Sequence, residues 1–382
     1  MSEDAVAPSP SAPPPQAPPA EVCPITADFL PPNLRKHVDP KAPPPLRMMA
    51  AKSLVPLAPS DMAGALFMLT YDPEANVRET ARKTAVGLPD RILASALRDE
   101  GIQAPVLGFF LRILADKDVY AEMLVLNGAT PDDAVAEVAA TCSTRVVEII
   151  AQNQLRVLRH GDILRRLVRN PNASRSVIDS VCDFAVRSGL DLPDVPELKE
   201  ARIRLFGPEA AQEPPERGPT ADEILDEFKE LGDESASPME EGKRLTFTQR
   251  IMKMSIAEKI KLATLGNKEA RGILLRDSNK LVAVAAIRSP RITEGEVMMM
   301  AANRAVNDDV LRVIYNNREW TKDYRVKLGL VKNPKTPMAL SMRFLATLRE
   351  TDVKEIARDR NVPSGIMQQA KKMLDKKSPK KE

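Results

Sequence analysis

Histidine and cysteine are common carriers of proton transfer and nucleophilic attack, and this chain has few of them. Its 382 residues include only two histidines, His37 and His160, and three cysteines. Cys142 and His160 lie near each other in the sequence, but a catalytic dyad would need them in hydrogen-bond contact. Nothing in the sequence brings them together, so we expect no catalytic residues and a protein that is not an enzyme.

Motifs for metal and phosphate chemistry are also missing from the sequence. It contains no HExxH, no GxSxG and no glycine-rich phosphate loop. The segment that begins at Gly266 lacks the second glycine and the Lys-Ser/Thr of such a loop, so we interpret it as a helix C-cap. Cys23, Cys142 and Cys182 are an odd number without CxxC spacing, which is typical of free thiols. We therefore expect no metal ion and no cofactor.

Cationic and aromatic side chains, by contrast, gather in one short stretch that includes the only tryptophan and two of the four tyrosines. Trp, Tyr and Arg are the usual anchors of protein–protein interfaces. Two interpretations of Trp320 stay open: a partly buried joint between helices, or the edge of a partner site. The predicted partner-binding residues, with two lysines that follow the stretch, are Arg312, Tyr315, Arg318, Trp320, Lys322, Tyr324, Arg325, Lys332 and Lys335.

The elements that position these residues are expected to be helices. The chain is 43% hydrophobic but only 4% aromatic, a balance that favours packed helices over a sheet sandwich. Its length is enough for two domains. No apolar run approaches membrane-spanning length, and the start lacks the features of a signal peptide. We therefore expect a cytoplasmic protein without membrane insertion.

An internal similarity supports repeats. Leu167-Val-Arg-Asn170-Pro171 is matched by Leu330-Val-Lys-Asn333-Pro334 at an offset of 163 residues. Asn-Pro forces the chain out of a helix, so the match indicates two equivalent helix ends. Residues 108–180 and 271–343 share 11 identities over 73 positions at this offset. The two interpretations are a duplicated domain and a likeness between any two units of one helical array.

Helix starts indicate a shorter period. Thr293 with Glu296 fits a capping box, and Thr130 precedes a proline at a first helical position. Thr293 and Thr336 are 43 residues apart, which fits the range of HEAT and armadillo repeats. Two apolar stripes at helical spacing predict buried faces, and Met298-Met-Met is interpreted as core filling. The stripes are Val310, Val313, Ile314 and Asn317, and Met338, Met342, Leu345 and Leu348.

These patterns resemble known repeat families. Asp72-Pro-Glu-Ala-Asn-Val-Arg-Glu-Thr-Ala81 resembles the start of a HEAT-repeat helix. Ser255 to Thr264, Gly266 to Arg271, Arg276 to Lys280 and Val331 to Pro337 resemble uncharacterised bacterial repeat proteins. The resemblance implies a bacterial cytoplasmic α-solenoid of the HEAT/armadillo kind, and it supplies no catalytic residue.

Charge and proline divide the chain. Residues 1–60 hold 16 of 33 prolines, residues 191–242 carry a net charge of −11, and residues 243–382 have 31 Lys and Arg against 15 Asp and Glu, a net charge of +16. We predict an all-α fold with two short HEAT-like α-solenoid domains joined by a flexible acidic linker. The predicted segments are a disordered Pro-rich tail at 1–59, helical repeats at 60–190, the linker at 191–244, basic helical repeats at 245–375 and a Lys-rich tail at 376–382.

One amphipathic helix is predicted inside the linker, at 220–231. This helix has a capping box, an acidic surface and one apolar stripe. A helix of this length is too short to be stable alone, so we expect it to fold only when docked. The basic domain offers the complementary charge for such an intramolecular contact. The predicted docking residues are Ile224, Leu225, Phe228 and Leu231.

The predicted function is a non-enzymatic scaffold or adaptor that binds protein partners of unknown identity. The +16 net charge of the C-terminal block motivates the alternative, which is nucleic-acid binding through phosphate contacts. Against it, no reading motif is present and the basic residues are spread out rather than clustered.

Overall fold

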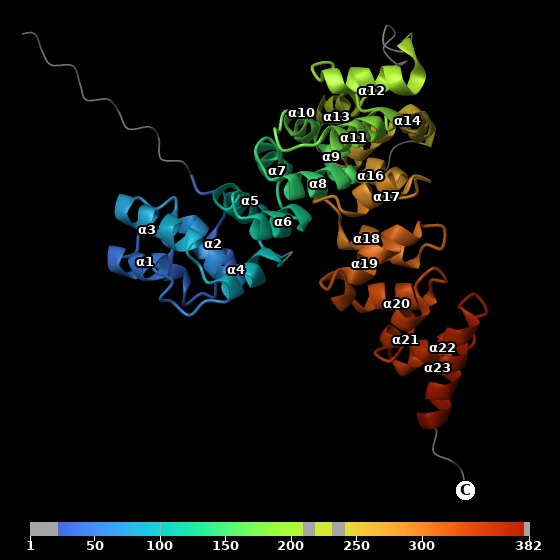
Figure 1. The fold of residues 1–382 in the computed structure, drawn as a ribbon. Coiled ribbons are helices and arrows are strands. Elements are labelled where there is room, and N and C mark those ends of the chain that lie inside the picture. The colour runs from blue at the N-terminus through green and yellow to red at the C-terminus, as the bar shows by residue number, and fades with distance from the viewer. Residues whose placement is uncertain (1–21, 100, 209–217, 231–240, 378–382) are drawn as a thin grey trace, which may run out of the picture. The chain divides into compact units, whose positions relative to one another are not determined.

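The computed structural model describes residues 22–99, 101–208, 218–230 and 241–377, which form a succession of helices (Figure 1). The described residues form helices and no strands, which confirms the all-α prediction. No helix among them is both long and apolar enough to cross a membrane. The chain divides into two compact units, residues 1–138 and 139–382.

In the first unit, helices pack on their neighbours and on the helices two places along: α1 contacts α3, α2 contacts α4, and α4 contacts α6. This pattern places alternate helices side by side. The elements are η1 Ala27–Phe29, η2 Arg35–His37, α1 Pro44–Ala51, α2 Pro59–Leu69, α3 Ala75–Val86, α4 Asp90–Leu97, α5 Ala104–Ile113, α6 Asp118–Leu126 and α7 Asp132–Ala139.

The N-terminal segment differs from the disordered tail predicted for residues 1–59. Its first 21 residues lie outside the described part, but the rest folds and buries Leu30 and Val38. The prolines there act as helix starts: Pro44 and Pro59 are the first residues of α1 and α2. Proline is well suited to that position because its missing N–H would have no partner inside the helix anyway. Proline count alone therefore overestimated disorder.

The second unit repeats the alternate packing. Helices α15, α17 and α19 contact one another in succession, α18 contacts α20, and α21 contacts α23. Figure 1 shows α16 to α23 following one another in order. The elements are α8 Thr144–Gln152, α9 Gln154–Arg159, α10 Asp162–Leu167, α11 Arg175–Arg187, α12 Pro196–Phe206, α13 Ala221–Glu230, α14 Glu241–Lys253, α15 Ile256–Leu265, α16 Lys268–Leu274, α17 Lys280–Ile287, α18 Glu294–Ala302, α19 Asp308–Asn316, η4 Trp320–Lys322, α20 Tyr324–Lys332, α21 Met338–Leu345, α22 Glu350–Ile356 and α23 Ser364–Lys377.

The segment predicted as a linker, 191–244, is more ordered than its composition indicated. Helix α12 packs on α11, and Leu198 and Ala201 on its inner face are buried. Helix α13 occupies the position of the predicted docking helix, and α14 begins before residue 245. The division between compact units falls at the end of α7 rather than in this segment. Of these helices, α13 carries acids on its exposed positions, such as Asp222 and Glu223, whereas α12 has as many basic as acidic side chains or more, so net charge alone did not distinguish a linker from helices.

Buried asparagines join the ends of alternate helices. Asn333, at the end of α20, donates from Nδ2 to the carbonyl oxygens of Ala301 and Asn303 at the end of α18, both at 3.0 Å. Its Oδ1 accepts the Lys335 N–H at 3.0 Å, which closes the following turn. One side chain thus satisfies carbonyls at the end of α18, which have no partner inside that helix, and an N–H in the turn after α20.

The same arrangement recurs where the sequence repeats. Asn170 donates to the carbonyl oxygens of Ala139 and Cys142 at 2.9 and 3.1 Å, and Asn127 donates to Leu97 O at 2.9 Å. Ser289 does the same with a hydroxyl, which donates to Thr264 O at 3.0 Å. Asn170 and Asn333 therefore hold equivalent structural positions, as their shared sequence context predicted. We refer to these side chains as the end clamps.

The clamped helices differ in spacing from the predicted period. Clamp partners lie 25 to 32 residues apart, whereas Thr293 and Thr336 are 43 apart. The 43-residue step crosses α18, α19, η4 and α20, so it does not return to an equivalent helix. A cap marks the start of any helix, and so matching caps alone cannot identify the repeat unit.

A glycine sets how closely two clamped helices approach. A Cβ built on Gly329 of α20 would lie 3.2 Å from the backbone nitrogen of Ala302 in α18. That distance would be too short for most side chains. Glycine, which has no Cβ, therefore allows the two backbones to approach closely beside the Asn333 clamp. Small residues at such a crossing allow short hydrogen bonds between the helix ends.

We predict that Asn333→Ala lowers the free energy of unfolding by about 1–3 kcal/mol, because two buried carbonyls and one N–H lose their partner. Urea unfolding followed by circular dichroism measures this change. The matched control is Asn316→Ala, at an exposed position of α19, which should change stability by no more than about 0.5 kcal/mol. Equal effects of the two substitutions would contradict the clamp.

Candidate interaction surface

The predicted partner-binding residues lie on α19, η4 and α20 and in the turns that follow them. The turn after α19 depends on Asn317, whose Oδ1 accepts the N–H groups of Glu319 and Trp320 at 3.0 and 3.2 Å. It starts η4 and directs Trp320 toward the core. Tyr315 and Trp320 are both half-buried against that core.

Trp320 also borders a small cleft between α18, η4 and α20. Its volume is about 20 Å³, which is room for about one water molecule. The geometry accords with a joint between helices, and it leaves one side of the residue at the cleft. The lining residues are Glu294, Val297, Glu319, Trp320, Asp323 and Val326.

A buried ion pair fixes the end of α18 that lines this cleft. Arg271 and Glu296, each 3% exposed, form two hydrogen bonds of 3.1 Å. Glu296 also accepts the N–H and the hydroxyl of Thr293 at 2.9 and 2.8 Å, and Arg271 donates to Gly266 O at 3.0 Å. The predicted capping box is confirmed, and it shares its carboxylate with an arginine from α16.

The charge of Glu296 is stabilised in place. Burial raises the pKa of Glu296, but hydrogen bonds from Arg271 and Thr293 outweigh burial and hold the pKa below its ordinary value. Glu296 therefore stabilises the folded state at pH values above the pKa that it has in the unfolded chain. That contribution disappears as the pH falls through the lower pKa of the folded state.

Tyr324 is used to join α20 to α22. Its hydroxyl donates to Asp352 and accepts the N–H of Arg349 at 3.1 Å. The Arg349 guanidinium lies 4.8 Å from the centre of the Tyr324 ring. Burial and the bond to Asp352 raise the pKa of Tyr324. This side chain, half-buried between two helices, is engaged inside the array.

Four of the predicted cations have partners within the unit. Lys322 contacts Glu319 at 2.7 Å, and Arg325 contacts Asp323 at 2.8 Å. Hydrogen bonds from the Arg325 side chain and backbone lower the pKa of Asp323. The remaining two reach neighbouring helices: Lys332 contacts Glu355 at 2.7 Å, and Lys335 donates to Val306 O at 2.8 Å.

Two of the predicted cations remain available. Arg312 on α19 and Arg318 after it are exposed, and neither forms an ion pair with any residue that the structure describes. Free arginines are suited to a partner's carboxylates because the guanidinium presents several donors in one plane. They are the part of the predicted site that internal contacts do not consume.

Two methionines add an exposed apolar element. Met338 and Met342 on α21 are 46% and 40% exposed, although the sequence stripe placed them on the buried face. The prediction is confirmed for Leu345, which is buried, and for Leu348, which packs against the core, but the other buried residues of α21 are Ser341 and Phe344. The run at 298–300 was interpreted as core filling, yet only Met300 is buried and Met299 is exposed.

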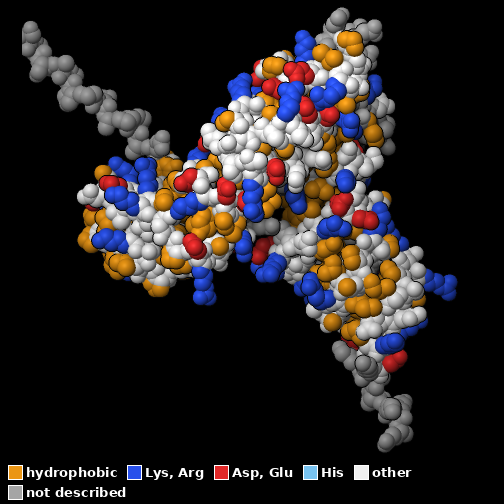
Figure 2. Space-filling view, viewed as in Figure 1, with side chains coloured by type: hydrophobic (Ala, Val, Ile, Leu, Met, Phe, Trp, Pro, Cys, Tyr) orange, Lys and Arg blue, Asp and Glu red, His pale blue; other side chains and the backbone are white. Residues whose placement is uncertain are grey.

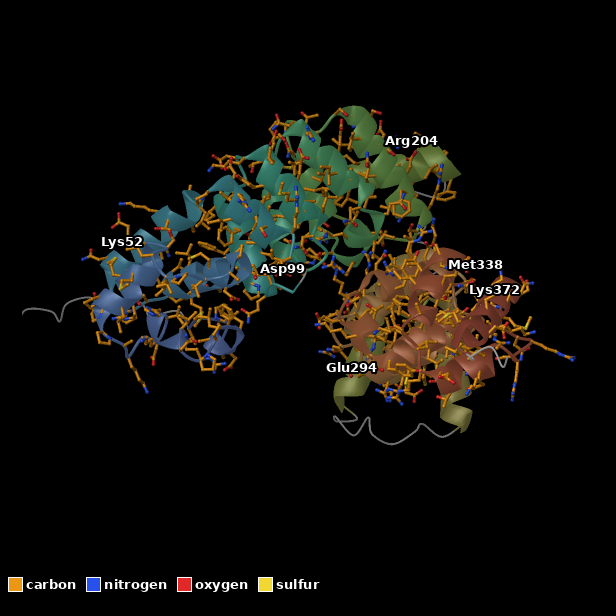
Figure 3. All side chains as sticks on the ribbon, turned by 90° about the horizontal axis from the view of Figure 1, so that it is seen from below. Lys52, Asp99, Arg204, Glu294, Met338 and Lys372 are labelled. Carbon is orange, nitrogen blue, oxygen red and sulfur yellow. The ribbon has the colours of Figure 1, made fainter. Side chains whose placement is uncertain are left out.

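Figure 2 shows apolar side chains gathered among Lys and Arg on the face it presents of the C-terminal helices. In Figure 3, Met338 of α21 and Glu294 of α18 lie on different sides of these helices. The methionine pair is therefore a feature separate from the cleft at Trp320. Helical spacing pointed to the pair, but only burial shows that it faces outward.

The predicted docking helix is α13. Ile224 is fully buried and Leu225 packs against the core of the second unit. The side chain of Phe228, and Leu231 as a whole, lie outside the described residues. Asp222 contacts Lys261 of α15, and Glu227 contacts Arg250 of α14. The expected intramolecular contact is present, and it lies on α14 and α15 rather than on α19 and α20.

The groups considered for catalysis occupy structural positions. His37 is buried, with Nδ1 3.2 Å from Leu46 O. The Cys142 thiol is buried, 3.5 Å from Asn170 Nδ2, and burial raises the pKa of Cys182 to about 12. His160 follows the end of α9. Among the described residues, no three His, Cys, Asp or Glu side chains are grouped to hold a metal ion.

No protein-family model, curated protein or solved structure matches this chain.

We predict that Glu296→Gln lowers the free energy of unfolding at pH 7 by about 3–5 kcal/mol, because Arg271 is left buried without a counter-charge. Between pH 5 and pH 3 the unmodified protein should lose more stability than the variant, since only it loses the Glu296 charge. Urea unfolding across this pH range tests both effects.

The control for this prediction is Glu294→Gln, two residues away on the same helix and exposed. It should change stability by less than about 0.5 kcal/mol. Parallel pH curves for the protein and for Glu296→Gln would contradict the assignment of the pH dependence to this pair.

Proposed function

We propose that this protein is a non-enzymatic interaction scaffold of the α-solenoid type, which binds protein partners through the surface of its second unit. The observation that supports the proposal is the packing of alternate helices, which the end clamps hold at their termini. An array of this kind grows in one direction and presents a long surface for partners. The likeness to HEAT and armadillo repeats is part of the proposal, as are a bacterial origin and a cytoplasmic setting.

The proposed partner site centres on the two arginines that internal contacts leave available. Arg312 and Arg318 supply charge, and the half-buried Tyr315 lies between them in the chain. Trp320 borders the cleft and packs against the core, so it fixes η4 next to this surface. An acidic partner segment with an apolar residue fits this combination of arginines and aromatic edges.

The other predicted residues support the site indirectly. Lys322 and Arg325 neutralise neighbouring acids, and Tyr324, Lys332 and Lys335 link successive helices. Exposed ion pairs of this kind contribute little binding energy of their own. We therefore assign these five residues to the rigidity of the surface rather than to direct contact.

Nucleic-acid binding is the alternative. Some cations of the C-terminal block are paired, for example Lys259 with Asp277 and Lys354 with Glu350, but pairs within the block leave its net charge of +16 unchanged. Phosphate binding depends on cations that release counterions, and paired lysines contribute less to that release.

We predict that the Arg312→Glu/Arg318→Glu variant reduces recovery of the protein partner more than tenfold, because each hot-spot arginine contributes about 2 kcal/mol or more. Quantitative affinity purification with the full-length chain measures the change. Both residues are exposed, so the circular dichroism spectrum and urea midpoint should be unchanged.

The matched control is Lys371→Glu/Lys372→Glu on α23, which makes the same change in net charge at exposed positions. It should retain the partner. If both double variants lose it equally, net charge rather than the proposed site is responsible, and if neither does, the site is wrong.

For the alternative, we predict that the full-length chain does not bind duplex or single-stranded DNA at about 200 mM salt, whatever it binds at about 50 mM. Fluorescence anisotropy at the two concentrations decides this. Tight binding at the higher concentration would favour the nucleic-acid function over the protein scaffold.

A further inference from the structure

Helix α13 packs against α15 and also contacts α14. Ile224 and Ala221 are fully buried in the core that includes Phe247 and Ile251 of α14 and Ile260 of α15. The chain that leads into the helix passes close to the end of α14. A Cβ on Gly218 would lie only 2.5 Å from the Lys253 carbonyl oxygen.

The start of α13 is held by a residue from another helix. Glu258 of α15 accepts the N–H of Ala221 at 2.7 Å. The Thr220 and Glu223 capping box satisfies two more N–H groups, which confirms its prediction from the sequence. A carboxylate placed at a helix N-terminus also interacts favourably with the helix dipole. The α14–α15 surface thus carries a built-in receptor for the first turn of a helix.

Two ion pairs fix the direction of the helix. Lys261 of α15 contacts Asp222 near the start of α13, and Arg250 of α14 contacts Glu227 five residues later, both at 2.6 Å. Between these acids lies Ile224, the apolar anchor. The surface therefore recognises a helix whose first turn offers an N–H group to Glu258. That helix also needs an acid, an isoleucine-sized residue and a second acid at these spacings.

The occupant of this surface is replaceable on physical grounds. Helix α13 has ten residues, and an isolated helix of that length is marginal in water. Its stability therefore depends on docking, which among the described side chains rests on Ile224, with support from Ala221, Leu225, the Glu258 hydrogen bond and two exposed ion pairs. A partner helix with the same pattern and one additional apolar contact would compete with it.

We propose that the α14–α15 surface is a docking site for acidic amphipathic helices of partner proteins, and that α13 occupies it until such a helix displaces it. This site is distinct from the surface around Arg312 and Arg318. It does not depend on that surface, and its partner is defined by the pattern of α13 itself. Binding at this site requires α13 to leave, so the apparent affinity is reduced by the fraction of molecules in which the site is open.

The test uses a fluorescent peptide of residues 218–231 as the probe and the full-length chain as the receptor. In the Asp222→Lys/Glu227→Lys receptor, the chain's own α13 faces Lys261 and Arg250 with like charges. These positions are 66% and 49% exposed, so the core is not altered. We expect this receptor to bind the peptide at least about tenfold more tightly than the unmodified chain does, because its site is open.

A charge exchange tests the same contacts from the other side. The Lys261→Glu/Arg250→Glu receptor should not bind the unmodified peptide but should bind a peptide that carries Asp222→Lys and Glu227→Lys. The Lys371→Glu/Lys372→Glu receptor has the same net charge as the Lys261→Glu/Arg250→Glu receptor, but it should bind both peptides as the unmodified chain does. Equal binding by the unmodified and the Asp222→Lys/Glu227→Lys receptors, or no rescue by the exchanged peptide, would overturn the proposal.

Sedimentation velocity distinguishes the remaining occupant, which is α13 of a second copy. The proposal expects the unmodified chain to sediment identically with and without excess peptide. Dimers that the peptide dissociates would show exchange of α13 between copies and would overturn the partner assignment. Loss of binding at Arg312 and Arg318 would leave these outcomes unchanged, so the two proposals fail separately.

Discussion

The carbonyl groups at helix C-termini are the constraint on which this structure depends. Many short helices leave many such groups without a partner, and burying them unpaired is costly. The chain meets this requirement with a side chain from a later turn: Asn333 donates to the carbonyls at the end of α18, and Asn170 donates to those of Ala139 and Cys142. The Asn-Pro sequence is effective here because proline ends the helix, and the asparagine then caps an earlier helix end while its oxygen accepts an N–H of its own turn.

The clamps explain why the candidate site is smaller than the cluster of charged and aromatic residues in the sequence. Helices are also joined by side chains other than the clamps: the Arg271–Glu296 pair links α16 to α18, and Tyr324 and Lys332 link α20 to α22. Residue types that favour interfaces between proteins also favour interfaces between helices. What remains for a partner is Arg312, Arg318 and the sides of their half-buried neighbours.

Local chemistry allowed much of the fold to be predicted, including the helical class, the Thr293 capping box, the equivalence of Asn170 and Asn333 and the position of α13. Errors arose where one residue type has two uses. Proline begins α1 and α2 as readily as it prevents a helix, so 22–59 was assigned to a tail. The acidic net charge of 191–242 resembled a linker although α12 folds there, and the predicted α21 stripe was right for Leu345 but wrong for Met338 and Met342, because a serine, Ser341, takes a buried position. Only part of the pairing in the site could be foreseen, since Lys322 and Arg325 pair with acids two or three residues away, whereas Lys332 pairs with Glu355, 23 residues away.

The end clamps also bear on how such a chain changes over evolutionary time. Each clamp reaches back only 25 to 32 residues, so it ties a helix to a near predecessor, whereas α15 also contacts α9 from much earlier in the chain. An inserted or deleted pair that carries its own asparagine keeps every other clamp intact. Length can therefore vary in whole pairs without the redesign of a central core, and the interval between two binding surfaces becomes an adjustable property of the array.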